Sequence, residues 1–188
     1  MTEFENSNAN DSENLVQEFT STKTLFIINL DDEIKLPSEY RKAFFIFNKA
    51  TKNDTIKLII NSYGGATNTA VQFFNLLIDT PAHTIADIYT ACSAGSIIAL
   101  GCNEINIRKF ATMMIHQSSW GINGKAEEIK SQSDFFTTLN KKILEDIYFS
   151  FLSQKEIKEI LKGKDFWFFE TEIKKRLETW IPYCKRNV

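Results

Sequence analysis

Cysteine is scarce in this sequence, and its placement excludes two common uses. The chain has three cysteines, Cys92, Cys102 and Cys184, and their spacing matches no zinc ligand set. An odd number of scattered cysteines also argues against a disulfide framework. We therefore expect no metal site, and a chain that works in a reducing compartment, the cytoplasm.

Long apolar runs and an excess of positive charge are missing as well. No stretch is both long enough and apolar enough to cross a lipid bilayer. The net charge is −2 at pH 7, and Lys and Arg are scattered rather than gathered on one face. The sequence therefore predicts a soluble protein that binds neither a membrane nor nucleic acid.

The N-terminal segment lacks basic residues and has hardly any apolar ones. Residues 1–22 do not have the layout of a secretory signal, and they have too little apolar surface to fold alone. We expect them to form a disordered acidic tail. The remaining residues 23–188 are enough for one hydrophobic core, so a single domain is expected there.

Strand-like and helix-like segments alternate along that domain. Short runs rich in β-formers predict strands over residues 24–30, 56–60, 84–89, 105–107 and 113–115. Apolar spacing and start signals predict helices after Pro37, over residues 69–78, from Ile97, over residues 126–152, and from Ser153, where Glu156 completes a capping box. This alternation predicts an α/β fold with mainly parallel strands, in which chemistry gathers at strand ends.

Histidine, the usual general base, occurs only twice. His83 lies in a predicted turn beside Pro81. His116 instead ends an apolar strand, where its ring can be held rigidly while facing a cleft. Taken alone, a histidine that simply forms hydrogen bonds at a strand end is an equally good interpretation of His116.

Ser93 lies among small residues where a predicted strand meets a helix. Backbone N–H groups at such a junction can stabilise an oxyanion, which suits a nucleophile. A serine there is more often a simple helix cap. The capping interpretation does not explain the glycine pair that ends the strand before it, or His116 at the end of a strand after it. Gly65, without a Cβ, can turn its N–H toward the space in front of Ser93.

A third group is needed to orient the histidine. Asp165 precedes an aromatic run, and there its carboxylate can accept a hydrogen bond from the imidazole. The alternative interpretation is a carboxylate that caps a helix. Spacing alone does not choose Asp165 over Asp87 or Asp146.

Four blocks of this sequence resemble the proteolytic subunit of the Clp peptidases, ClpP, in a divergent form. They are INSYGG at residues 60–65, ACSAG at 91–95, MMIHQ at 113–117 and DFW at 165–167. The blocks occur in the order and near the spacings of that family, over residues 24–181. Each block is weak alone, and together they are specific.

The resemblance implies a fold and a set of roles. The fold is the ClpP/crotonase-like spiral of β-β-α units with a protruding handle helix, the handle region covering about residues 117–152. Ser93, His116 and Asp165 take the places of the catalytic triad, and the N–H groups of Gly65 and Ala94 those of the oxyanion hole. The substrate strand would pair with the segment that begins at the histidine, namely Gln117, Ser118, Ser119, Trp120 and Gly121.

The resemblance also implies an assembly and its partners. ClpP-like subunits form a heptameric ring, and two rings stack to enclose the active sites; the chemistry needs no cofactor. Lys57 and Ile59 stand where the family has aromatic residues in the docking pocket for an ATP-driven AAA+ unfoldase, which counts against such a partner. Tyr63 and Ser118 replace prolines that are common in the family.

Three functions follow from these observations. The first is a self-compartmentalised serine endopeptidase that cleaves peptides or unfolded proteins, or matures a particular assembly, through an acyl-enzyme. The second is a catalytically silent ring subunit with a structural role. The third is a crotonase-like enzyme acting on acyl-CoA, which would make the combination of Ser93, His116 and Asp165 a coincidence. A Ser-Lys dyad is disfavoured because no lysine stands at position 116.

Overall fold

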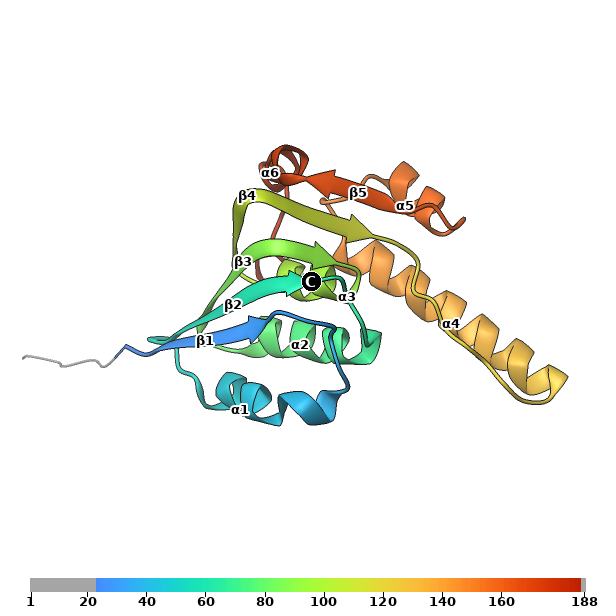
Figure 1. The fold of residues 1–188 in the computed structure, drawn as a ribbon, viewed down its shortest axis with the longest axis horizontal. Coiled ribbons are helices and arrows are strands. Elements are labelled where there is room, and N and C mark those ends of the chain that lie inside the picture. Colours follow the sequence, from blue (N-terminus) through green and yellow to red (C-terminus); the bar gives the residue numbers. More distant parts are fainter. Residues whose placement is uncertain (1–22, 187–188) are drawn as a thin grey trace, which may run out of the picture.

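A single sheet organises the part of the chain that the computed structural model describes, residues 23–186. Its strands are β1 (Leu25–Leu30), β2 (Thr55–Ser62), β3 (His83–Cys92), β4 (Glu104–Ile115) and β5 (Phe166–Phe169). They lie side by side in chain order, the first four parallel and β5 antiparallel to β4. The prediction of a mainly parallel α/β sheet is confirmed (Figure 1).

One face of this sheet is covered by helices. In β2, alternate residues Ile56, Leu58 and Ile60 are fully buried, as the period of two in a strand requires. The helices are α1 (Arg41–Lys49), α2 (Thr67–Asp79), α3 (Ala94–Leu100), α4 (Ala126–Ile147), α5 (Gln154–Ile160) and α6 (Glu170–Leu177), with short 3-10 helices η1 (Pro37–Tyr40) and η2 (Tyr183–Lys185). One apolar cluster extends from Ile28 in β1 to Ile173 in α6.

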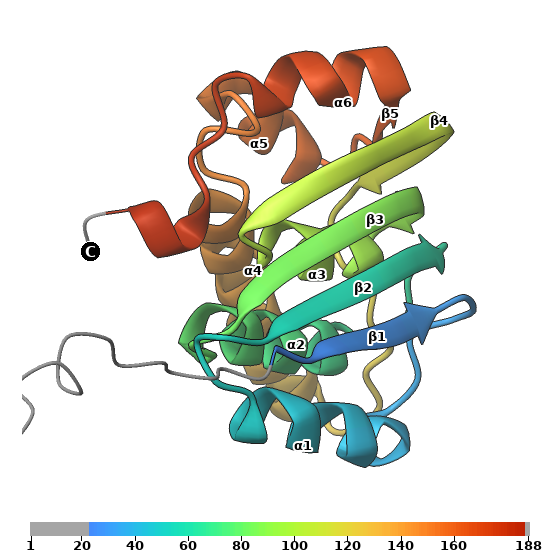
Figure 2. The same cartoon turned by 90° about the vertical axis from the view of Figure 1, so that its left-hand side faces the viewer.

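The opposite face of the sheet carries an ion-pair cluster. Figure 2 looks onto this face, with the strands in front and α2, α3 and α4 behind them. Asp87 in β3 is almost fully buried and pairs with Arg108 of β4 and with Lys57 of β2, whose Nζ lies 3.5 Å from its Oδ2. Burial alone would raise the pKa of Asp87, but these cations, together with Asn106, hold it below its usual range.

Strand β4 differs from the prediction of two short strands. Residues 105–107 and 113–115 belong to one strand that continues through the polar residues between them. The register with β3 jumps there, from Ile88 opposite Ile107 to Thr90 opposite Thr112, and Phe110 adopts a φ of 63°. The strand therefore bulges but does not end, since Asp87 holds Arg108 alongside β3.

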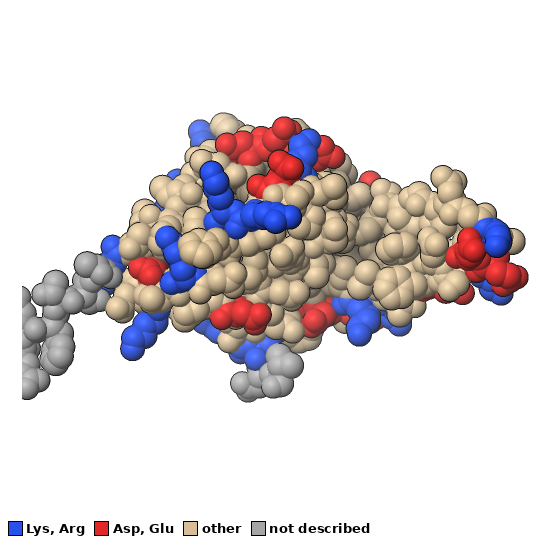
Figure 3. All heavy atoms as spheres, turned by 90° about the horizontal axis from the view of Figure 1, so that it is seen from below, with Lys and Arg blue, Asp and Glu red and all other residues tan. Residues whose placement is uncertain are grey.

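The long helix α4 begins at the predicted residue but ends at Ile147 rather than at residue 152. A turn follows, in which Ser150 has a φ of 63°, a conformation that no α-helix accommodates. The first half of α4 projects away from the sheet (Figure 1). Seen from below, its surface is largely uncharged up to a group of charged side chains at the far end (Figure 3).

The next helix, α5, begins as the sequence predicts. Ser153 Oγ accepts a hydrogen bond from the Glu156 N–H, and the Glu156 carboxylate accepts one from the Ser153 N–H. Within residues 23–186, no helix combines the length and the apolar character that crossing a bilayer requires. The predicted tail, residues 1–22, lies outside the described residues.

Candidate active site

Ser93 stands alone between β3 and α3, in a backbone conformation that side chains rarely adopt. Its φ is 52° and its ψ is −117°. Its N–H donates to the Met114 carbonyl at 2.7 Å, and its own carbonyl accepts from the N–H (2.9 Å) and the Oγ (2.7 Å) of Ser96. Anchoring on both sides maintains this strained turn between a strand and a helix.

The hydroxyl of Ser93 is directed at the histidine. Ser93 Oγ and His116 Nε2 are 2.7 Å apart, a good hydrogen-bond distance. Although Ser93 occupies the N-cap position of α3, its side chain caps no N–H within the described part of the chain. Since β3 and β4 are adjacent and parallel, the residues that follow them meet at one edge of the sheet. The capping interpretation of Ser93 therefore does not apply.

Asp165 lies next to His116 but is not joined to it. It directly precedes β5, and the pairing of Ile115 with Phe166 makes His116 and Asp165 the next residues to face each other across β4 and β5. The Asp165 side chain is exposed, and no hydrogen bond between it and His116 exists among the described residues. Of the other two carboxylates considered, Asp87 is paired with Arg108 and Lys57, and Asp146 lies near the end of α4, with no hydrogen bond to His116 among the described residues.

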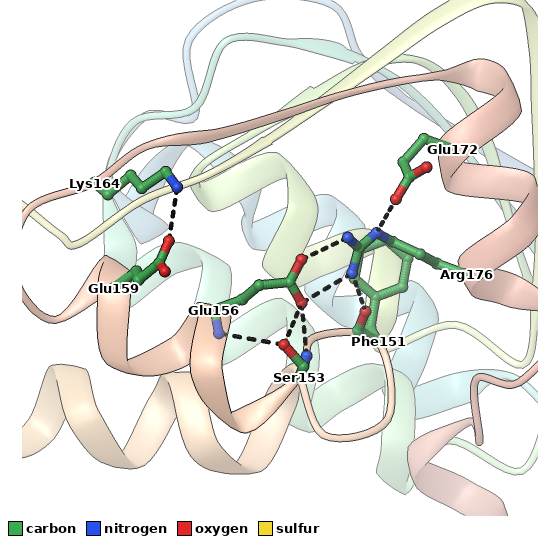
Figure 4. Close-up of polar contacts among 7 residues, drawn as sticks. All are labelled: Phe151, Ser153, Glu156, Glu159, Lys164, Glu172 and Arg176. Atoms are coloured by element: carbon green, nitrogen blue, oxygen red, sulfur yellow. Dashed lines mark hydrogen bonds and ion pairs between the residues drawn. The ribbon is translucent and has the colours of Figure 1, made fainter.

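The strand that carries Asp165 at its start is clamped by α5 and α6. Arg176 of α6 reaches Glu156 of α5, with Nη2 2.6 Å from Oε1, and its guanidinium lies over the ring of Phe168 in β5, 4.4 Å from the centroid. Figure 4 shows the ion pair between Arg176 and Glu156, and the hydrogen bond that the Glu156 carboxylate accepts from the Ser153 N–H. Burial alone would raise the pKa of Glu156, but the bonds from Arg176 and Ser153 lower it to about 2.

Two backbone N–H groups near Ser93 have no acceptor within residues 23–186: those of Gly65 and Ala94. Ile34 and Gly65 form an isolated parallel β-bridge. The Ile34 N–H donates to the Gly64 carbonyl, and the Ile34 carbonyl accepts from the Ala66 N–H, both at 2.8 Å. In such a bridge the N–H of the middle residue points away from its partner. Ala94 is the first residue of α3, whose N–H has no partner within the helix.

Gly64, rather than Gly65, is the glycine that packs against Ser93. A Cβ at Gly64 would come within 2.7 Å of the Ser93 Cβ and 3.0 Å of the Cys92 carbonyl. A Cβ at Gly65 would instead strike the backbone of Ile34, 2.2 Å from its carbonyl oxygen. The sequence predicted that Gly65 needs to lack a Cβ in front of Ser93, whereas it is Gly64 that borders Ser93 and Gly65 that borders Ile34.

A pocket of about 330 Å³ lies between helix α4 and the segments that follow Gly65 and His116 in the chain. Its wall includes Thr67 and Asn68, which follow Gly65, and Ser118, Ser119 and Trp120, which follow His116. Helix α4 closes the other side with Phe136, Leu139, Asn140 and Ile143. Of the five predicted substrate-binding residues, three therefore line this pocket, while Gln117 and Gly121 do not.

The family model described as Clp protease matches residues 7–175 of the 188-residue chain. The chain belongs to the Clp protease family. Its fold and its general class, a ClpP-like peptidase, follow from that membership. Among curated proteins, none matches the chain significantly in sequence.

The Clp protease family generally forms rings. The sheet face opposite the helices carries Lys57 and Ile59, the two positions that bear on binding of an unfoldase. Lys57 is committed to the ion pair with Asp87. Ile59 lies beside it, between Asn29 of β1 and Asp87 of β3. A charged and an aliphatic side chain thus occupy the two positions at which the ClpP family has aromatic residues.

Metal ligands do not gather in the described part of this Clp family member. No group of three or more His, Cys, Asp or Glu side chains in residues 23–186 is arranged to hold a metal ion. Cys92 and Cys102 are buried free thiols, and burial raises the pKa of both. Neither is suited to be a thiolate nucleophile.

One residue of the candidate site, Asn140, was missed by sequence reasoning. It lies on α4 between Phe136 and Ile143, four and three residues away, and so on the same helical face. An amide within an otherwise apolar stripe was the available signal. Its Oδ1 accepts the Ser118 N–H at 3.1 Å and so ties the segment after His116 to the helix.

Proposed function

We propose that this chain is a serine endopeptidase subunit of a ClpP-like ring, with Ser93 as nucleophile and His116 as general base. The observation that carries the proposal is the 2.7 Å separation of Ser93 Oγ and His116 Nε2, at the end of two adjacent strands. Unprotonated Nε2 accepts the hydroxyl proton as Oγ attacks a peptide carbonyl carbon. No cofactor takes part in this step.

The remaining steps use backbone groups and Asp165. The carbonyl oxygen, now negative, accepts hydrogen bonds from the Gly65 and Ala94 N–H groups, whose acceptor positions are free within residues 23–186. His116 then donates its proton to the leaving amine as the C–N bond breaks, and water later hydrolyses the acyl-Ser93 ester. Asp165 turns its carboxylate toward Nδ1 of His116 to orient the ring.

The substrate is an extended peptide. Its backbone pairs with the segment of Gln117, Ser118, Ser119, Trp120 and Gly121, and the side chain preceding the cleaved bond enters the pocket of about 330 Å³. Pairing through backbone atoms accepts many sequences, so unfolded chains are suitable substrates.

The proposed assembly is a ring of seven subunits, in one or two layers, in the cytoplasm. The ion pair between Lys57 and Asp87 argues that the ring works without an AAA+ unfoldase.

A specific observation supports the second function, a silent ring subunit. Asp165 makes no hydrogen bond to His116 in the described chain, so the imidazole lacks its third partner. The crotonase-like alternative has no comparable support, because it gives the contact between Ser93 and His116 no role. Reactivity at Ser93 separates the first two functions.

The test is labelling of the purified chain with a fluorophosphonate probe. The native chain should be labelled, Ser93→Ala should not, and His116→Ala should react at least about 100-fold more slowly because the base is gone. Ser131→Ala and His83→Ala, which alter an exposed serine and the other histidine, are matched controls and should react like the native chain. Labelling should also increase as the pH rises, because only an unprotonated imidazole can accept the hydroxyl proton.

Each result has a distinct meaning. Labelling that survives Ser93→Ala rejects this serine as nucleophile, and a flat pH profile rejects a histidine base. A native chain that is folded, assembled and never labelled supports the silent subunit. Asp165→Asn should slow labelling less than His116→Ala, since it leaves the proton acceptor in place.

A further inference from the structure

The pocket lined by the segments that follow Gly65 and His116 contains a buried amide whose donor is not used. Asn140 is 3% exposed, and its Nδ2 has no hydrogen-bond partner in the described chain. Its Oδ1 accepts the Ser118 N–H at 3.1 Å, which fixes the orientation of the amide, because only an oxygen can accept that N–H. The NH₂ group is therefore the free end of this side chain.

An unpaired donor at this depth is costly. A buried amide N–H without an acceptor destabilises a folded chain, because it has given up its hydrogen bonds to water and gained none in return. Leucine would fill a similar volume in the apolar stripe of α4 without that cost. Structure alone explains the Oδ1 contact with Ser118 but gives no role to Nδ2.

The surroundings of Nδ2 define what can pair with it. The pocket is lined mainly by apolar groups, among them Val71, Trp120 and Ile143, and it has no Lys or Arg. An ionised carboxylate would be buried there without a countercharge, which is unfavourable. A neutral carbonyl oxygen at the end of a long side chain satisfies both the donor and the apolar walls.

We propose that Asn140 is a specificity-determining residue that favours glutamine immediately before the cleaved bond. This inference rests on the proposed peptidase function and names its substrate class. The glutamine methylenes lie against Val71 and Ile143, and the glutamine Oε1 accepts from Asn140 Nδ2. Because Asn140 Nδ2 lies beneath the pocket surface, the glutamine side chain must displace part of the pocket wall to reach it. Residues 118–120 form that part of the wall, and they can move because they have no regular secondary structure.

The experiment compares two peptides that differ only in the residue before the cleaved bond, glutamine or norleucine. Norleucine has a similar length and no acceptor. For the assembled native chain, kcat/KM should be about tenfold higher for glutamine. In Asn140→Leu that ratio should fall by about tenfold or more, through loss of the glutamine peptide. Asn75→Leu, the same substitution at an exposed asparagine of α2 that does not line the pocket, should keep the native ratio.

The outcomes distinguish this inference from the function on which it rests. A native chain that reacts with the fluorophosphonate probe but cleaves both peptides equally, or prefers norleucine, overturns the role of Asn140 alone. An unchanged ratio in Asn140→Leu does the same. If Asn140→Leu fails to fold, the native ratio still decides. A native chain that neither reacts at Ser93 nor cleaves either peptide overturns the peptidase function and this inference together.

Discussion

The backbone conformation of Ser93 determines where its hydroxyl lies. Its φ of 52° and ψ of −117° are strained, and hydrogen bonds with Met114 and Ser96 maintain them. In this turn the hydroxyl does not cap the helix that follows and instead contacts His116. Neighbouring residues must leave room for such a turn, and Gly64 does so because it has no Cβ.

Gly64→Ala tests that requirement. Gly64 has a φ of 113°, and an added Cβ would come within 2.7 Å of the Ser93 Cβ. We expect labelling of Ser93 to slow by about 100-fold or more, because displacement of the nucleophile by a fraction of an ångström misaligns it with the base. The labelling rate and the free energy of unfolding, from denaturant titration, are measured together.

Gly163→Ala is the matched control. Gly163 has a similar φ of 94°, but a Cβ there meets no atom within 4 Å. It should lose about 1 kcal/mol of stability through backbone strain and keep the native labelling rate. Equal effects of both substitutions on labelling would contradict a steric role of Gly64.

Among single residues, the sequence pointed to those that stand out by their rarity or by their neighbours. His116 was one of two histidines, and Ser93 stood among small residues. Sequence order did not reveal that the Asp165 side chain makes no hydrogen bond to His116, because rotamers depend on tertiary neighbours. Asn140 was overlooked because a single amide on a helix face has no periodic signal of its own.

Among the elements, β5 depends most on its surroundings. It has four residues, and both Trp167 and Phe169 are exposed. Its position rests on pairing with β4 and on the clamp in which Arg176 joins Glu156 and covers Phe168. Because Asp165 directly precedes β5, the clamp also positions the third member of the candidate triad.

Glu156→Gln should weaken this clamp. The pKa of Glu156 is lowered from 4.5 to about 2, so ionisation stabilises the folded state above about pH 4.5, and this contribution is lost as the pH falls toward about 2. The variant should lose about 2 kcal/mol at pH 7, where the partly buried pair is intact. Denaturant titrations at pH 7 and at pH 3 measure the difference.

The same experiment has an internal check. The gap between native and variant should narrow at pH 3, since Glu156 is then protonated in the unfolded chain, and this protonation offsets part of the stabilisation by the ion pair. Lys164→Met, which breaks the more exposed pair with Glu159, is the control and should cost less than about 1 kcal/mol. A gap that stays constant with pH would contradict the ionic origin of the clamp.

The elements were predictable where their patterns were long. The apolar stripe of α4 and the capping box of α5 gave their first residues correctly. The end of α4 was wrong because the apolar pattern continues through Phe151 and Leu152, which are buried in a turn rather than a helix. β5 was not predicted, since four aromatic residues give no alternation to read, and its place is set by pairing with β4.

In the molecule as a whole, α4 is the most conspicuous unburied feature. Ile129, Phe135 and Leu139 expose 38%, 62% and 39% of their surface along it. Figure 3 shows the mostly uncharged surface of this projection. Apolar side chains on a projecting helix are suited to contact with another subunit, and this agrees with the proposed ring assembly.

Phe135→Asp should reduce the size of the assembly. A charge placed in an apolar contact must be desolvated without a partner, so the particle mass in solution should fall at a given concentration. Thr137→Asp adds the same charge at an exposed position about 200° around the helix and should leave the mass unchanged. Light scattering after size-exclusion chromatography measures both, and equal behaviour of the two variants would contradict the role of Phe135.

The strands of the sheet stand in the same order as in the chain, and this has a consequence for biosynthesis. Each strand pairs with the one translated just before it, so the sheet can grow stepwise as the polypeptide leaves the ribosome. Ser93 and His116 meet once β4 has joined β3, whereas Asp165 arrives only with the last strand. A nascent chain can therefore bring the proposed nucleophile and base together before the strand that carries their proposed third partner has been synthesised.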